Sequence, residues 1–138
     1  NACLASESGI LEPIRAILAV FQPDLLFLPH GNDSNPDHQI VCRTVLELIR
    51  QLPYQPSVFL NADPKTVGLR PDFMTVFDEQ EAEWKAELLR FHASQHRRNL
   101  RTRGIGFDQR ILANNRELAF RAGFPDAYLE LFEQSTLR

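Results

Sequence analysis

Residues 25–38 read Leu-Leu-Phe-Leu-Pro-His-Gly-Asn-Asp-Ser-Asn-Pro-Asp-His, and they form the most informative part of the sequence. Its first four residues are a continuous apolar run of strand length, a pattern typical of a strand buried on both faces. Residues 29–36 have the composition of a loop, and a helix is predicted to begin at Asp37. Polar side chains between a buried strand and a helix start lie where open α/β sheets bind ligands. The sequence therefore predicts a ligand site at this junction.

Apolar periodicity on both sides of the junction predicts alternating helices and strands. The predicted helices span residues 10–20, 37–52, 79–98 and 107–121, and the predicted strands span residues 25–28, 57–60, 73–77 and 128–132. Pro13 falls in the expected first turn of the first helix, where proline is tolerated. This order predicts an α/β fold, a Rossmann-like parallel sheet with flanking helices.

Only the strands at 25–28 and 57–60 have the composition of buried strands, and two parallel strands do not make a stable layer by themselves. The chain also starts with Asn1 rather than Met. We therefore expect residues 1–138 to form a single α/β domain that is the C-terminal part of a larger one. Upstream strands or a partner chain would complete its sheet.

Composition narrows the class of protein. The 138 residues are 43% hydrophobic and 24% charged, which is ordinary for a soluble globular domain. A net charge of −3 argues against nucleic acid as the partner. No apolar stretch approaches the ~20 residues that span a bilayer, and no signal peptide is visible. Cys3 and Cys42 lack metal-site spacing, so we expect two reduced thiols in a cytoplasmic protein.

Three segments resemble the PIG-L / LmbE-like zinc de-N-acetylases, in the family's order. Residues 35–38, Asn-Pro-Asp-His, resemble its His-Pro-Asp-His at a helix start. Residues 85–95 resemble its Lys-x-x-Ala-Leu-x-x-His-x-Ser-Gln helix, and residues 128–132, Tyr-Leu-Glu-Leu-Phe, resemble its C-terminal Tyr-Ala-Glu-x-Phe. The resemblance implies an LmbE-like fold and a Zn²⁺-dependent hydrolase. The implied substrate is an N-acetylated amino sugar, such as N-acetylglucosamine, or a glycoconjugate.

The sequence departs from this family twice. The family's first signature, Ala-His-Pro-Asp-Asp-Glu, which supplies two zinc ligands and the general base, is absent. Asn35 stands where the family has the first histidine of His-Pro-Asp-His, a residue credited with stabilising the oxyanion or protonating the leaving amine. An asparagine can donate a hydrogen bond to an oxyanion but cannot shuttle a proton. Upstream polypeptide or a partner chain is therefore expected to complete the active site.

The resemblance assigns roles to the junction residues. His38 matches a zinc ligand, and a neutral imidazole is a standard ligand of catalytic zinc. Asn35 and Asp37 are expected at the catalytic centre, Asp37 as a carboxylate that orients its polar neighbours and also caps the helix. Asp33 is predicted to form the turn or to face substrate. His30 is predicted to be a loop residue on the substrate side.

Later residues receive plainer predictions. His92, Ser94 and Gln95 are expected to be hydrogen-bonded and partly buried, joining helix to sheet. Residues 96–103 form the only basic cluster, for which nucleic acid, a phosphate or anionic sugar, and a solvated helix end are the alternatives. The solvated helix end is favoured, because cations complement the C-terminal helix dipole.

Two other functions stay open beside the hydrolase. The first is a degenerate, non-catalytic relative that binds a sugar or a partner, which Asn35 favours. The second is an unrelated nucleotide-binding α/β domain, although the chain has no glycine-rich phosphate loop. The sequence leaves the oligomeric state open, a homo-oligomer included.

Overall fold

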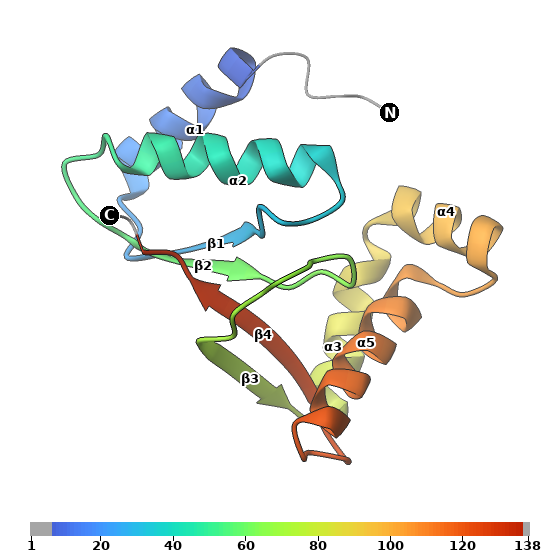
Figure 1. The fold of residues 1–138 in the computed structure, drawn as a ribbon. Coiled ribbons are helices and arrows are strands. Elements are labelled where there is room, and N and C mark those ends of the chain that lie inside the picture. The colour runs from blue at the N-terminus through green and yellow to red at the C-terminus, as the bar shows by residue number, and fades with distance from the viewer. Residues whose placement is uncertain (1–6, 137–138) are drawn as a thin grey trace. The chain divides into compact units, whose positions relative to one another are not determined.

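A computed structural model describes residues 7–136, and their side chains from residue 11 on. The described chain forms two compact units, one containing the residues up to Phe73 and from Leu131 on, the other Met74–Glu130. The elements, shown in Figure 1, are α1 (Glu7–Phe21), β1 (Leu25–Pro29), α2 (Pro36–Ile49), β2 (Ser57–Asn61), β3 (Phe73–Phe77), α3 (Glu79–Arg90), α4 (Ala93–Arg103), α5 (Phe107–Arg121) and β4 (Tyr128–Gln134).

The first unit packs α1 and α2 against one face of β1 and β2 (Figure 1). The two strands are parallel, as predicted, with Leu25 paired to Ser57 and Pro29 paired to Asn61. All four elements contribute to the core, whose buried residues are Leu18, Leu28, Cys42, Val45, Leu48, Ile49, Val58 and Leu60. Burial of this apolar area is the main force that fixes the junction between β1 and α2.

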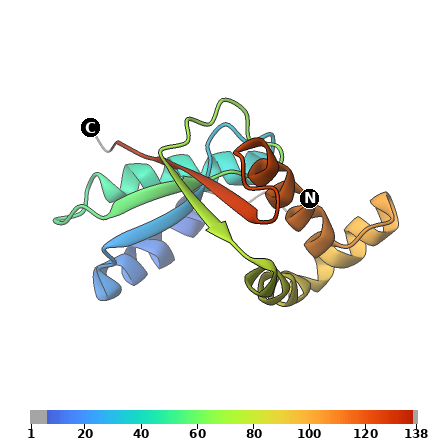
Figure 2. The ribbon, with the colours of Figure 1, turned by 90° about the horizontal axis from the view of Figure 1, so that it is seen from below.

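The opposite face of this sheet is open. Leu25 and Phe27 of β1 are 46% and 57% exposed, and β1 and β2 lie in front of both helices when seen from below (Figure 2). The Phe27 ring contacts the rings of Phe59 and Phe132, with centroids 5.8 and 5.4 Å apart. The prediction that residues 25–28 are buried on both faces is therefore wrong, because Leu25 and Phe27 are exposed on the face opposite α1 and α2.

The strand order is β1-β2-β4-β3, which leaves β1 at an edge of the described sheet. β4 runs antiparallel to β2, so the sheet is mixed rather than wholly parallel, with Leu60 opposite Glu133 and Asn61 opposite Phe132. Directly paired residues point to the same face. Glu133 therefore lies on the face that carries Leu60 and the core.

The second unit shows one clear departure from the sequence prediction. The single helix expected over residues 79–98 is two helices, because α3 ends at Arg90 and α4 begins at Ala93. Asp78 caps α3 by accepting from the N–H of Glu81, whose side chain accepts from the N–H of Asp78 in return. No glycine or proline marks the break at residues 91–92, so periodicity alone could not reveal it.

Three smaller findings complete the fold. Pro13 lies inside α1 rather than in its first turn, since the helix already begins at Glu7. Cys42 is a free, buried thiol, and burial raises its pKa; Cys3 lies outside the described residues. No helix of residues 7–136 has both the length and the apolar composition needed to cross a bilayer.

Candidate functional site

The start of α2 is held by Asn35. Its side-chain Oδ1 accepts from the N–H of Asp37 at 3.1 Å, and Pro36 occupies the first helical turn, where its missing N–H costs nothing. The N-cap is therefore Asn35. The sequence had predicted Asp37 in this role, and that prediction is wrong. Asp37 follows in the first turn, where its charge complements the helix dipole.

Asp33 and His38 form a hydrogen-bonded dyad at this junction. Asp33 is 2% exposed. Its Oδ1 accepts from the N–H of Asn35 at 2.7 Å, and its Oδ2 lies 3.0 Å from Nδ1 of His38. A carboxylate can only accept, so Nδ1 of His38 carries the proton and donates it. The lone pair is then on Nε2, which no described residue hydrogen-bonds.

This arrangement fits a metal ligand. Metal-binding histidines usually donate their other ring N–H to a carboxylate, which fixes the tautomer and the ring orientation. The His38 side chain is 36% exposed, so a ligand from outside can reach this side chain. The carboxylate that orients His38 is Asp33, whereas the sequence had given that task to Asp37.

A complete metal site is not formed by this part of the chain alone. Within residues 7–136, no three histidine, cysteine or carboxylate side chains gather closely enough to hold a metal ion. A catalytic zinc needs three protein ligands. The geometry therefore offers one oriented ligand position, at His38.

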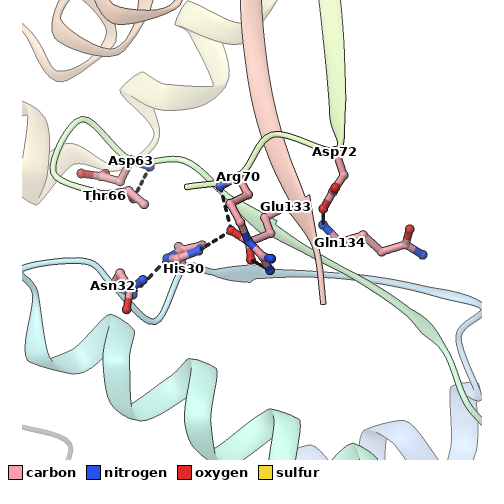
Figure 3. Close-up of polar contacts among 8 residues, drawn as sticks. All are labelled: His30, Asn32, Asp63, Thr66, Arg70, Asp72, Glu133 and Gln134. Carbon is pink, nitrogen blue, oxygen red and sulfur yellow. Dashed lines mark hydrogen bonds and ion pairs between the residues drawn. The ribbon is translucent and has the colours of Figure 1, made fainter. Parts of the chain in front are cut away.

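His30 is buried just after the end of β1, with 5% of its surface exposed. Its Nδ1 accepts from the N–H of Asn32 at 3.0 Å, so the ring proton is on Nε2. Nε2 lies 3.2 Å from Oε2 of Glu133, to which it donates (Figure 3). Both ring nitrogens thus have partners within the chain, and His30 is a neutral hydrogen-bonding bridge.

Glu133 is the central acceptor of the group in Figure 3. Its Oε2 accepts from the backbone N–H of Arg70 at 2.9 Å, and its Oε1 accepts from the Arg70 guanidinium at 2.9 Å. The backbone N–H of Arg70 is the largest cause that lowers the pKa of Glu133 to about 2, and the Arg70 guanidinium and His30 add to it against the cost of burial.

Sequence reasoning missed Glu133. A signal was present, because Leu129 and Leu131 lie four and two positions before Glu133, and alternate residues of a strand point to the same face. This alternation puts an acidic side chain on the buried face of a strand. Such a group needs a partner, since an unpaired buried charge is strongly unfavourable.

In the second unit, two of the segments that carry the family resemblance meet. The ammonium group of Lys85, from α3, pairs with the carboxylate of Glu130, from β4, and donates to Asn115 at 2.8 Å. Asn115 is buried and donates to the backbone carbonyl of Leu129 at 2.8 Å. These contacts fasten α3 and α5 to the start of β4.

The other predicted residues of this unit are less buried than expected. His92, Ser94 and Gln95 are exposed, so the prediction that they are partly buried is wrong. His92 lies in the break between α3 and α4, and its ring contacts that of Phe107 edge to face at 6.2 Å. The arginines of the last turn of α4 are exposed ahead of Gly104, consistent with a solvated helix end.

The sequence matches no known family model and no curated protein. Similar solved structures include the following two. The zinc-inhibited form of teicoplanin deacetylase Orf2 has a TM-score of 0.65 and 17% identity, over 94% of this chain and 52% of that one. The conserved protein TT1542 from Thermus thermophilus has a TM-score of 0.62 and 20% identity, over 91% of this chain and 57% of that one.

The chain has the fold of these two structures. The predicted fold class, a sheet with flanking helices, is thereby confirmed. Identities this low show the fold alone. The chain spans about half the length of each of the two structures, 52% and 57%.

Proposed function

We propose that this chain supplies part of the active site of a zinc-dependent hydrolase, which removes an N-acetyl group from an amino sugar or glycoconjugate. One observation carries the proposal: a buried carboxylate, Asp33, holds His38 in the tautomer that leaves Nε2 for a metal. The likeness to a deacetylase structure supports the reaction class.

His38, Asn35 and Asp37 have different roles in the proposed reaction. Nε2 of His38 would hold the zinc, which when bound polarises the amide carbonyl and lowers the pKa of its water. Asn35 uses its side-chain oxygen as the helix cap, so its amide N–H groups remain to donate to the oxyanion. Asp37 adds a second carboxylate beside His38, in keeping with the role that the resemblance implies.

The other zinc ligands and the general base are proposed to come from polypeptide outside these 138 residues. Two features of the first unit support this. β1 has an unpaired edge in the described sheet, and the open face beside it exposes Leu25 and Phe27. Unpaired edges and large exposed apolar side chains are features that proteins cover.

Metal content of the intact protein that contains this chain tests the proposal. After dialysis against metal-free buffer, we expect close to one zinc per protein. His38→Ala should lose it, because the oriented ligand is gone. The matched control, His92→Ala, removes an exposed histidine of the other unit and should keep the zinc. Absence of zinc from the unsubstituted protein would refute the proposal.

A non-catalytic sugar-binding relative is the second candidate, and Asn35 in the place of a histidine favours it. Acetate release from an N-acetylated amino sugar separates the two functions. The hydrolase predicts acetate release by the unsubstituted, zinc-loaded protein. The binding relative predicts sugar binding without acetate release, and Asn35→His then tests whether the missing proton donor is the reason.

A further inference from the structure

We propose that Glu133 and His30 are positioning residues for His38. They hold the loop of residues 31–35 and thereby the Asp33 carboxylate that orients the ring, although neither residue touches His38. The meaning of this inference for catalysis rests on the proposed function, but the contacts themselves do not require a metal.

The first step is the anchoring of Glu133. Its side chain is 12% exposed and accepts from both the backbone and the guanidinium of Arg70. The backbone of β4 is fixed in turn by its pairing with β2, in which Glu133 stands opposite Leu60. The carboxylate is therefore a stationary acceptor on the core face of the sheet.

The second step is the tautomer of His30. Because Glu133 can only accept, it keeps the proton of His30 on Nε2. Nδ1 is then free to accept from the N–H of Asn32 at 3.0 Å. In the other tautomer, a proton on Nδ1 of His30 would face the N–H proton of Asn32, and the hydrogen bond between them would be lost. The contact with Asn32 therefore depends on Glu133.

The third step passes from the loop to the dyad. The N–H of Asp33 donates to the carbonyl of His30 at 3.3 Å, and the N–H of Val67 donates to the carbonyl of Asn32 at 3.1 Å. A bridge between Asp33 and Thr66 fixes the same loop from the other side. Release of the Asn32 N–H thus removes one of the contacts that position the backbone carrying Asp33.

Asp33 has little room to move. It is 2% exposed and bonds the N–H of Asn35 and the ring of His38 at the same time. A displacement of the loop lengthens one or both bonds, and hydrogen bonds weaken steeply with poorer geometry. Glu133 thereby acts on His38 through His30, Asn32 and Asp33.

The test is the tautomer of the His38 ring in the metal-free intact protein, which ¹⁵N and ¹H NMR can measure. In the unsubstituted protein we expect the Nδ1–H of His38 to be visible and protected from exchange. Glu133→Ala should abolish that protected signal and shift the ring ¹⁵N resonances toward a mixture of tautomers. Gln134→Ala, on the neighbouring exposed position of β4, is the control and should leave them unchanged.

Two further variants keep the test decisive. Glu133→Gln retains an oxygen that accepts from His30, so it should restore the His38 signal. His30→Phe keeps an aromatic ring but removes both hydrogen bonds, so it should lose the signal as Glu133→Ala does. The methyl resonances of Leu48 and Val58 report whether the core is intact.

An unchanged His38 signal in Glu133→Ala or His30→Phe, with an intact core, overturns the inference. Failure of the proposed function looks different. In that case the signal still responds to Glu133→Ala, but the intact protein binds no zinc with or without the substitution. If the inference and the function both hold, Glu133→Ala also weakens zinc binding, by less than the ~10–100-fold that loss of a direct partner of a metal ligand costs.

Discussion

At the scale of single residues, Asp33 determines the tautomer of His38, the proposed metal ligand. In Asp33→Asn, the side-chain oxygen can still accept from the N–H of Asn35, but an amide N–H₂ then faces Nδ1 of His38. The ring proton is driven to Nε2, where it blocks the lone pair needed by a metal. We expect zinc affinity to fall by about 10–100-fold, measured by chelator competition in the intact protein.

Asp63→Asn is the control for this substitution, because Asp63 also accepts from a backbone N–H two residues further on but does not touch His38. It should leave zinc affinity unchanged. Equal zinc affinity in Asp33→Asn and the unsubstituted protein would contradict the assigned tautomer.

Glu133 gives the protein a defined pH dependence. Its pKa falls from an ordinary 4.5 to about 2 on folding. The stabilisation is therefore complete above about pH 4.5 and is lost as the pH falls toward 2. Because Arg70 is exposed and screened, the effect is on the order of 2 kcal/mol. Urea unfolding should show Glu133→Gln less stable at pH 6, with the gap narrowing below about pH 4.5 and closing as the pH falls through about 2.

A gap between Glu133→Gln and the unsubstituted protein that stays constant over this pH range would show that the carboxylate charge contributes nothing to stability. Arg70→Gln is the companion variant. It removes the guanidinium but keeps the backbone donor, which is the larger cause of the low pKa. Arg70→Gln should therefore lose only part of the pH dependence of stability that the unsubstituted protein shows.

The residue scale also shows what the sequence could predict. His38, Asp33 and Asn35 lie within six positions of one another, so a local pattern placed them at one junction. Glu133 lies 103 positions from His30 in the chain. Their contact depends on the antiparallel pairing of β4 with β2, which local periodicity does not determine.

At the scale of elements, the start of α5 depends on a glycine. The N–H of Gly106 donates to the side chain of Gln109 at 2.8 Å. A Cβ at this position would overlap Oδ1 of Asp108 and lie 2.7 Å from Cε1 of His96. Asp108 cannot easily move, because it is 3% exposed and bonds Arg90 at 2.7 Å.

We therefore expect Gly106→Ala to destabilise the protein by about 1–3 kcal/mol, the usual cost of overpacking. The matched control is Gly31→Ala, whose Cβ would lie at an ordinary 3.4 Å from Sγ of Cys42. Urea unfolding of the two variants measures the difference. Equal stability of both variants would show that the space around Gly106 can relax.

Elements with strong local signals were predicted well. α2 follows a polar loop and has a regular apolar face, and both of its ends lie near the predicted ones. The break between α3 and α4 was missed because no helix-breaking residue marks it; His92, which lies in the break, contacts the ring of Phe107. The burial of β1 was overestimated, because an apolar run does not reveal how many faces are covered.

At the scale of the whole molecule, an edge strand of the described sheet lies next to the candidate site. β1 is an edge strand of the described sheet, and the site at its end offers one oriented histidine. The scarcity of buried strands predicted that further polypeptide completes the sheet, and the absence of the family's first signature predicted that it completes the site. We keep this as a proposal, supported by structures of the same fold of which this chain covers 52% and 57%.

A structure of the intact protein grown with zinc, with the metal located by its anomalous scattering, tests the central claim most directly. We predict zinc about 2.0–2.1 Å from Nε2 of His38, with Nδ1 still bonded to Asp33. Zinc bound at another place, or Nε2 of His38 occupied by a protein group, would contradict the claim.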